Sequence, residues 1–121
     1  MFERFTEKAI NLITESQNQA KEMHNAYVQP EHLLLAIVKQ SKGIPLKLFR
    51  MYGITYEEVK KEVKNRLRFE KSEKELQTVP FSGEFKNLLK QVLDLANTSG
   101  NYVLFEHLFL VAIQDKSSSI L

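Results

Sequence analysis

Two glutamate-histidine pairs are the residues of this chain whose types and spacing could do chemistry. Glu31-His32 lies in "YVQPEHLLLAIV" (residues 27–38), and Glu106-His107 lies in "YVLFEHLFLVAI" (residues 102–113). Such side chains can ligate a metal ion, but no His-Glu-x-x-His spacing and no cysteine accompanies them. We therefore predict no metal site and no catalytic residue. His32 and His107 are expected to be structural residues near the core.

The elements that must position these pairs are predicted to be helices. The chain has four glycines and three prolines, and its apolar residues recur at spacings of three and four rather than two. The segment from Pro30 to about Gln40 is apolar on nearly all sides, which indicates a central buried helix begun by its proline. The other helices expected in the first half run from about Thr6 to Met23, from Pro45 to Tyr52 with Gly53 as a stop, and from Thr55 to about Arg68.

The same order of elements returns in the second half of the chain. Residues 69–79 are polar and read as a linker, after which Ser82 can cap a helix that precedes the second glutamate-histidine segment. The distance from Thr6 to Glu31 is 25 residues (31 − 6), and that from Ser82 to Glu106 is 24 (106 − 82). We therefore predict an internal duplication, with repeat 1 over residues 1–68 and repeat 2 over residues 80–121. Repeat 2 stops about where repeat 1 enters its third helix, so we expect a fragment of a longer chain.

Composition narrows the class of protein. Charged residues make up 26% and apolar residues 43% of 121 residues, which is typical of one globular domain. The absence of cysteine fits a reducing compartment, and neither a signal peptide nor a membrane span is recognisable, so we expect a cytoplasmic protein. The basic run Lys60 to Arg68 is interrupted by Glu62 and is predicted to be a solvated helix face. No G-x-x-x-x-G-K-[ST] phosphate loop is present, so we expect no ATPase activity in this chain.

Four segments carry a resemblance to a known family. "MFERFTEKA", "EHLLLAIV", "PFSGEFKNLL" and "NYVLFEHLFLVAI" occur in the order found in the N-terminal domains of the Clp ATPases, which are hexameric AAA+ unfoldases, and most of all in the ClpC type. The resemblance implies an all-α domain of two pseudo-twofold-related four-helix repeats, the second incomplete here. It implies protein substrates and adaptor proteins as partners, with no nucleic acid and no membrane. It also implies a parent protein that docks a ClpP-like peptidase and holds ATP and magnesium in modules outside this chain.

The resemblance also implies candidate binding residues. In ClpC-type domains each repeat can bind a phosphorylated arginine, with the glutamate on the guanidinium and a hydroxyl residue near the phosphate. By position this pairs Thr6 with Glu31 and Ser82 with Glu106. The chemistry is sound, because a carboxylate accepts a guanidinium fork and a helix N-terminus favours phosphate. The plain alternative is that the hydroxyl residues are N-caps and that the glutamates favour the positive ends of their helices.

A hydrophobic patch is the other candidate site. Phe2, Phe5 and Phe81 should cluster if the starts of the two repeats lie together. We predict that Phe5 belongs to the core and that Phe2 and Phe81 form an apolar patch for ligands or adaptors.

Two alternative functions stay open. ClpC-type domains usually have Gly-Thr before Glu-His, where this chain has Gln29-Pro30 and Leu104-Phe105. Residues of this kind are commoner in ClpB-like disaggregases, whose N-domains bind unfolded apolar segments. A small helical nucleic-acid-binding protein is the more distant alternative, and it would need a contiguous basic groove.

Overall fold

The computed structural model describes residues 2–98, 100, 102–115 and 120, and the side chain of residue 44 is not described. The regular structure of these residues is helical, and they form three isolated bridges but no strand. The all-α class predicted from the sequence is thus confirmed. The helices are α1 (Glu7–Glu22), α2 (Pro30–Gln40), α3 (Gly43–Met51), α4 (Tyr56–Arg66), α5 (Gly83–Thr98) and α6 (Phe105–Gln114).

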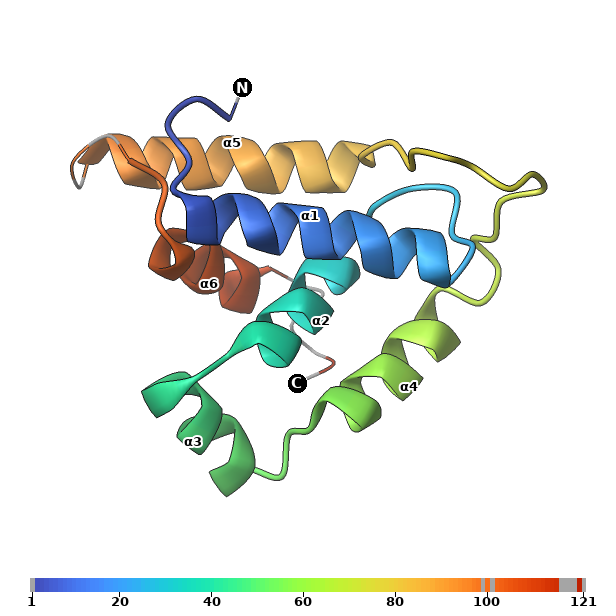
Figure 1. The fold of residues 1–121 in the computed structure, drawn as a ribbon, viewed down its shortest axis with the longest axis horizontal. Helices are drawn as coiled ribbons and strands as arrows, with labels where there is room; N and C mark the ends of the chain where they lie inside the picture. Colours follow the sequence, from blue (N-terminus) through green and yellow to red (C-terminus); the bar gives the residue numbers. More distant parts are fainter. Residues whose placement is uncertain (1, 99, 101, 116–119, 121) are drawn as a thin grey trace.

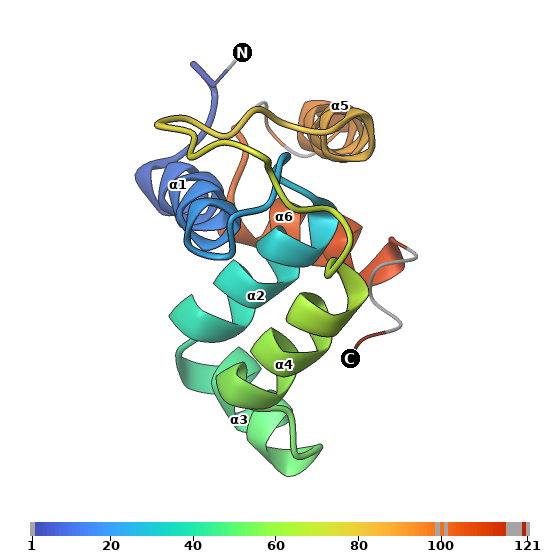
Figure 2. The ribbon, with the colours of Figure 1, turned by 90° about the vertical axis from the view of Figure 1, so that its right-hand side faces the viewer.

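Helix α2 is the central helix of the fold. Helices α1 and α5 run in opposite directions along one side of the molecule (Figure 1), and α2 and α6 lie beneath them (Figure 2). Helix α2 packs on α1, α4, α5 and α6. Its side chains from Leu33 to Val38 are all buried, because an apolar helix needs neighbours on every face. Helix α3 lies at the far end, where Phe49 meets Phe109 of α6 with ring centroids 6.1 Å apart.

The bridges reveal how the two repeats are related. Phe5, just before α1, pairs with Val103, just before α6, and Phe81, just before α5, pairs with Val28, just before α2. The first bridge maps onto the second when the repeats are exchanged, since 81 − 5 is 76 and 103 − 28 is 75. This reciprocal pattern is what a pseudo-twofold axis between two copies produces. Each copy therefore pairs its lead-in segments with the other copy.

Two helix boundaries differ from those predicted. Helix α3 begins at Gly43 rather than Pro45. The first four N–H groups of a helix need no acceptor within it, so the proline fits in the first turn without being first. Helix α4 ends at Arg66 rather than near Arg68, because the Asn25 side chain donates hydrogen bonds to the carbonyl oxygens of Leu67 and Glu70.

The predicted linker, residues 69–79, contains no helix. Its first part lies against the connection between α1 and α2, where the N–H of Ala26 donates to Glu70 and that of Ser72 donates to His24. Its last residue, Val79, is buried in the core. The division of the chain at these residues stays a prediction.

Candidate functional site

His32 is a structural residue, as predicted. Its Nδ1 accepts a hydrogen bond from the backbone N–H of Gln29 at 2.8 Å, and its Nε2 lies 2.8 Å from Oδ1 of Asn25. An imidazole that accepts at Nδ1 and donates at Nε2 is neutral. Burial lowers the pKa of His32 from its usual 6.5 to about 4. The side chain therefore joins the start of α2 to Asn25, which in turn holds the end of α4.

His107 repeats this arrangement in the second copy. It is buried, and its Nδ1 accepts a hydrogen bond from the backbone N–H of Leu104 at 2.9 Å. The two histidines thus satisfy the same kind of orphan donor at the starts of α2 and α6. No group of three His, Asp, Glu or Cys side chains that could hold a metal ion occurs within the described part of the chain.

Thr6 and Ser82 cap their helices. The Thr6 hydroxyl accepts from the N–H of Ala9 at 3.3 Å, and the Ser82 hydroxyl accepts from the N–H of Phe85 at 3.0 Å. Ser82 is buried. Both residues thus have the capping role that was the alternative to ligand binding, and neither lines the two pockets described below.

The pairing of cap and glutamate within each repeat needs a correction. The N–H of Thr6 donates to Val103, three residues before Glu106, and the N–H of Ser82 donates to Val28, three residues before Glu31. The start of α1 therefore adjoins Glu106, and the start of α5 adjoins Glu31. The reason is that the segments before the helices pair between the two repeats, at Phe5–Val103 and Val28–Phe81. A search for repeated sequence motifs does not reveal this pairing.

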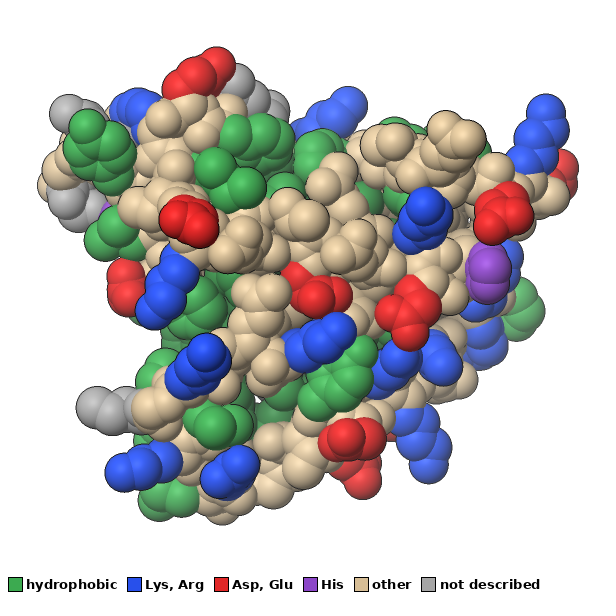
Figure 3. Space-filling view, in the orientation of Figure 1, with side chains coloured by type: hydrophobic (Ala, Val, Ile, Leu, Met, Phe, Trp, Pro, Cys, Tyr) green, Lys and Arg blue, Asp and Glu red, His purple; other side chains and the backbone are tan. Residues whose placement is uncertain are grey.

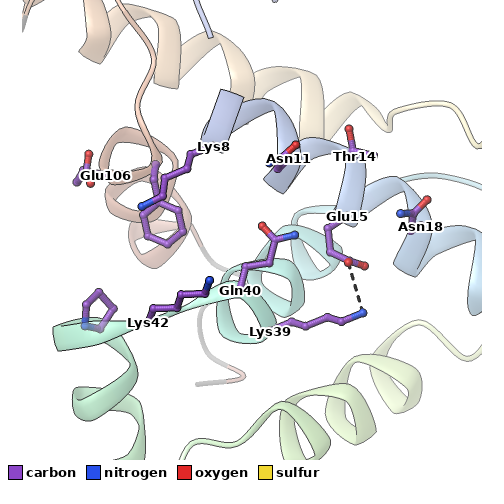
Figure 4. A pocket seen from close by; sticks show the side chains of 11 residues that line it. Lys8, Asn11, Thr14, Glu15, Asn18, Lys39, Gln40, Lys42 and Glu106 are labelled. Atoms are coloured by element: carbon purple, nitrogen blue, oxygen red, sulfur yellow. Dashed lines mark ion pairs between the residues drawn. The ribbon is translucent and has the colours of Figure 1, made fainter. Parts of the chain in front are cut away.

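Glu106 lies in a pocket between α1 and α6, which we call the α1–α6 pocket. Its volume is about 690 Å³. Figure 4 shows Lys8 and Glu106 at the end where α1 begins, with Glu15 and its ion pair to Lys39 toward the other end. The lining residues are Lys8, Asn11, Thr14, Glu15, Asn18, Lys39, Gln40, Lys42, Pro45, Phe105 and Glu106. A cation and a carboxylate at one end of a pocket can contact a ligand that carries both signs of charge.

Glu31 lies in a second pocket, at the starts of α2 and α5, which we call the α2–α5 pocket. Its volume is about 500 Å³. Burial raises the pKa of Glu31 above its usual value, and the nearby carboxylates of Glu70 and Asp115 add to the rise, while a backbone hydrogen bond and Arg66 oppose it. The lining residues are Gln29, Pro30, Glu31, Arg66, Leu67, Glu70, Glu84, Asn87, Gln91 and Asp115.

The predicted phenylalanine cluster is present. The ring of Phe2 meets that of Phe5 at 5.0 Å and that of Phe81 at 6.2 Å, and Phe81 stacks on Phe85 at 5.0 Å. Phe5 is buried in the core, as predicted, whereas Phe2 and Phe81 are half-buried against it. The use of Phe2 and Phe81 as a ligand patch stays a prediction.

Sequence reasoning missed the pocket residues of α1 and α5. The polar side of α1 carries Lys8, Asn11 and Glu15 at helical spacing. This pattern predicts a solvent-exposed helix face and gives no indication of a pocket. It also missed the exposed apolar side chains Met51, Tyr52, Phe69 and Tyr102, which lie on α3, its end and the connecting segments.

The basic run has the predicted environment. Lys61, Lys64 and Arg66 of α4 are exposed, while Val59 and Val63 beneath them are buried. On the face seen in Figure 3, basic side chains are interspersed with acidic ones rather than gathered in a continuous groove. No helix in the described ranges is long and apolar enough to cross a membrane.

Comparison with known proteins places the chain. A family model described as the Clp repeat (R) N-terminal domain matches residues 4–121. "Chaperone protein ClpC2, chloroplastic" of Arabidopsis thaliana is 33% identical over 116 residues, which are 95% of this chain and 12% of that protein. "Negative regulator of genetic competence ClpC/MecB" of Bacillus subtilis is 29% identical over 116 residues, which are 95% of this chain and 14% of that protein. The chain therefore spans a small part of the length of these curated relatives.

Solved structures agree on the fold. The N-terminal domain of the chaperone ClpD from Arabidopsis thaliana superposes with a TM-score of 0.78 at 27% identity, over 98% of this chain and 82% of that one. The Hsp104 N-terminal domain from Candida albicans gives a TM-score of 0.74 at 20% identity, over 98% and 77% of the two chains. The second likeness is one of fold alone.

Proposed function

The chain belongs to the family of Clp repeat N-terminal domains, and from this premise we propose that it receives protein substrates and adaptor proteins for an ATP-dependent, ClpC-like unfoldase. ATP and magnesium would be held by modules of the full-length protein, since this chain has no phosphate loop. Assembly into hexamers, docking on a ClpP-like peptidase and a cytoplasmic location belong to the same proposal. Some relatives are chloroplast proteins, so the compartment stays a prediction.

The ligand that fits the geometry best is a phosphorylated arginine side chain. The observation that carries this part of the proposal is the α1–α6 pocket, where Lys8 and Glu106 lie at the same end. A carboxylate can accept two N–H groups of a guanidinium, and an ammonium group beside a helix N-terminus favours phosphate. The Lys8 side chain forms no hydrogen bond or ion pair with another described residue, whereas the Lys39 side chain is held by Glu15 at 3.3 Å.

An NMR titration tests this ligand. Free phosphoarginine, added to the ¹⁵N-labelled chain, should shift the backbone amide signals around Glu106 and Thr6, or those around Glu31 and Ser82. Free arginine, which has the guanidinium but not the phosphate, is the matched control and should bind at least tenfold more weakly because it lacks the charge-assisted contacts of the phosphate. The combined variant Glu31→Ala with Glu106→Ala should lose the response. If millimolar phosphoarginine shifts no signal near either glutamate, the ligand is wrong while the family membership stands.

A second candidate function is the binding of unfolded apolar segments, as expected of a ClpB-like disaggregase. It is favoured by the half-buried rings of Phe2 and Phe81, which lie beside each other at the starts of the two repeats. A competition experiment separates the two candidates. An unfolded apolar peptide that displaces phosphoarginine would indicate one shared surface. An apolar peptide that binds when phosphoarginine does not would favour the disaggregase.

A further inference from the structure

The two pockets occupy equivalent places in the duplication. The residues of α1 that line one pocket correspond to residues of α5 that line the other, with an offset of 76 (84 − 8, 87 − 11, 91 − 15), and those of α2 correspond to those of α6 with an offset of 75 (105 − 30, 106 − 31). The bridges beside the pockets show the same two offsets. The matched pairs are Lys8 with Glu84, Asn11 with Asn87, Glu15 with Gln91, Phe105 with Pro30, and Glu106 with Glu31.

The equivalent pockets differ in charge. The glutamate at the start of the buried helix is kept, but the cation Lys8 of the α1–α6 pocket is replaced by the carboxylate Glu84 in the α2–α5 pocket. The whole lining of the α1–α6 pocket has three lysines and two glutamates, which gives +1 (3 − 2). That of the α2–α5 pocket has one arginine against three glutamates and one aspartate, which gives −3 (1 − 4).

We propose that only the α1–α6 pocket accepts a phosphorylated arginine, and that Lys8 and Glu84 are the residues that decide between the two pockets. This inference rests on the proposed function and adds to it that the domain binds one such ligand rather than two. A phosphoryl group carries a charge of about −2, so Lys8 attracts it, whereas Glu84 repels it. The neighbouring carboxylates of the α2–α5 pocket, Glu31, Glu70 and Asp115, strengthen this repulsion.

Exposure makes the two residues suitable for exchange. Lys8 and Glu84 are both exposed on the first turns of long helices, so their side chains can be reversed in charge without disturbing the core. Glutamate in the first turn of α5 also interacts favourably with the helix dipole, and a lysine there loses only this small surface interaction. The variants should therefore fold.

The experiment counts sites by residue-specific NMR titration with free phosphoarginine. The wild-type chain should show saturable shifts at the start of α1 and around Glu106, and shifts at least tenfold weaker in apparent affinity at the start of α5. Glu84→Lys should add a second site of comparable affinity around Glu31. Lys8→Glu should weaken the first site at least tenfold. The matched controls are Lys61→Glu and Glu73→Lys, which make the same charge changes at exposed residues outside both pockets and should leave both sites unchanged.

The outcomes separate this inference from the function on which it rests. Two wild-type sites with affinities within about threefold would overturn the inference and leave phosphoarginine binding intact. A Glu84→Lys variant that still binds at α1 alone would also overturn it, because Glu84 would then not be the deciding residue. If neither the wild type nor Glu84→Lys binds phosphoarginine at any concentration reached, the proposed ligand itself is refuted.

Discussion

The buried imidazole of His32 should make the stability of the domain fall in mildly acidic solution. Its Nδ1 accepts a backbone hydrogen bond from Gln29, and its Nε2 contacts Asn25, so a proton added at Nδ1 would break the first of these bonds. The ring is fully buried, and this burial accounts for its lowered pKa. A charged imidazole there would therefore be costly.

The size of the effect follows from the two pKa values. The unfolded chain binds a proton at this residue below its usual pKa of 6.5, whereas the folded chain does so only below about 4. Between these values the unfolded state holds more protons, so the stability contributed by His32 is complete above pH 6.5 and is lost as the pH falls toward 4. At about 1.4 kcal/mol per pH unit, the loss reaches roughly 3 kcal/mol. That is a large part of the 5 to 15 kcal/mol typical of a domain.

Urea unfolding at pH 7.5, 6.5, 5.5 and 4.5 measures this loss. His32→Gln should be less stable than the wild type at pH 7.5 by about 1 to 3 kcal/mol, since it leaves buried hydrogen-bonding groups poorly matched. Its stability should fall less steeply toward pH 4.5, so the two curves approach each other. The control is His24→Asn, because His24 is exposed and its φ of 58° is one that asparagine tolerates. Parallel curves for the wild type and His32→Gln, or an NMR titration midpoint of His32 near 6.5, would refute the reasoning.

Three other changes test the electrostatics and the helix ends. Glu31→Gln should raise the free energy of unfolding at pH 7, because a carboxyl group with a raised pKa opposes folding once it is ionised. In urea unfolding this gain should disappear below pH 4.5, where the carboxyl group is protonated in both the folded and the unfolded state. Ser82→Ala should lower stability by about 1 kcal/mol in urea unfolding, because the N–H of Phe85 loses its acceptor; an unchanged midpoint would mean that this cap contributes nothing. Gly53→Ala should cost about 1 to 2 kcal/mol through its φ of +69°, with no side chain within 4 Å to add a clash, while Gly83→Ala should cause no such loss in the same thermal unfolding assay.

The helices could be predicted because each carries its own local signals. The Thr6 and Thr55 caps, Pro30 at the first position of α2 and the wholly apolar run from Leu33 to Val38 depend on short stretches of chain. The duplication could be predicted as well, because it preserved words such as Glu-His at a fixed spacing. The end of α4 could not, since it is decided by a hydrogen bond from Asn25, 42 residues away from Leu67 in sequence.

The composition of the candidate site could not be read from the sequence for the same reason. Which glutamate adjoins which helix start depends on the exchange of lead-in segments at Phe5–Val103 and Val28–Phe81, which is a tertiary event. Lys8 and Glu84 gave no signal by themselves, because charged residues in the first turns of amphipathic helices are ordinary. Their proposed role in ligand choice becomes apparent only when the linings of the two equivalent pockets are compared.

The duplication separates the residues that hold the fold from those that can distinguish ligands. In both copies the histidine of Glu-His accepts a hydrogen bond from the backbone N–H three residues before it, so its repetition is explained by helix architecture. The glutamate in front of it lies in the first turn of α2 or α6 and lines a pocket in both copies. A second lining residue, which is Lys8 in the α1–α6 pocket and Glu84 in the α2–α5 pocket, differs in sign between the copies. The two equivalent pockets thus share a glutamate, Glu106 or Glu31, but differ in the sign of the second residue, so they should not prefer the same ligand. Each pocket can therefore serve as the control for the other in a binding experiment.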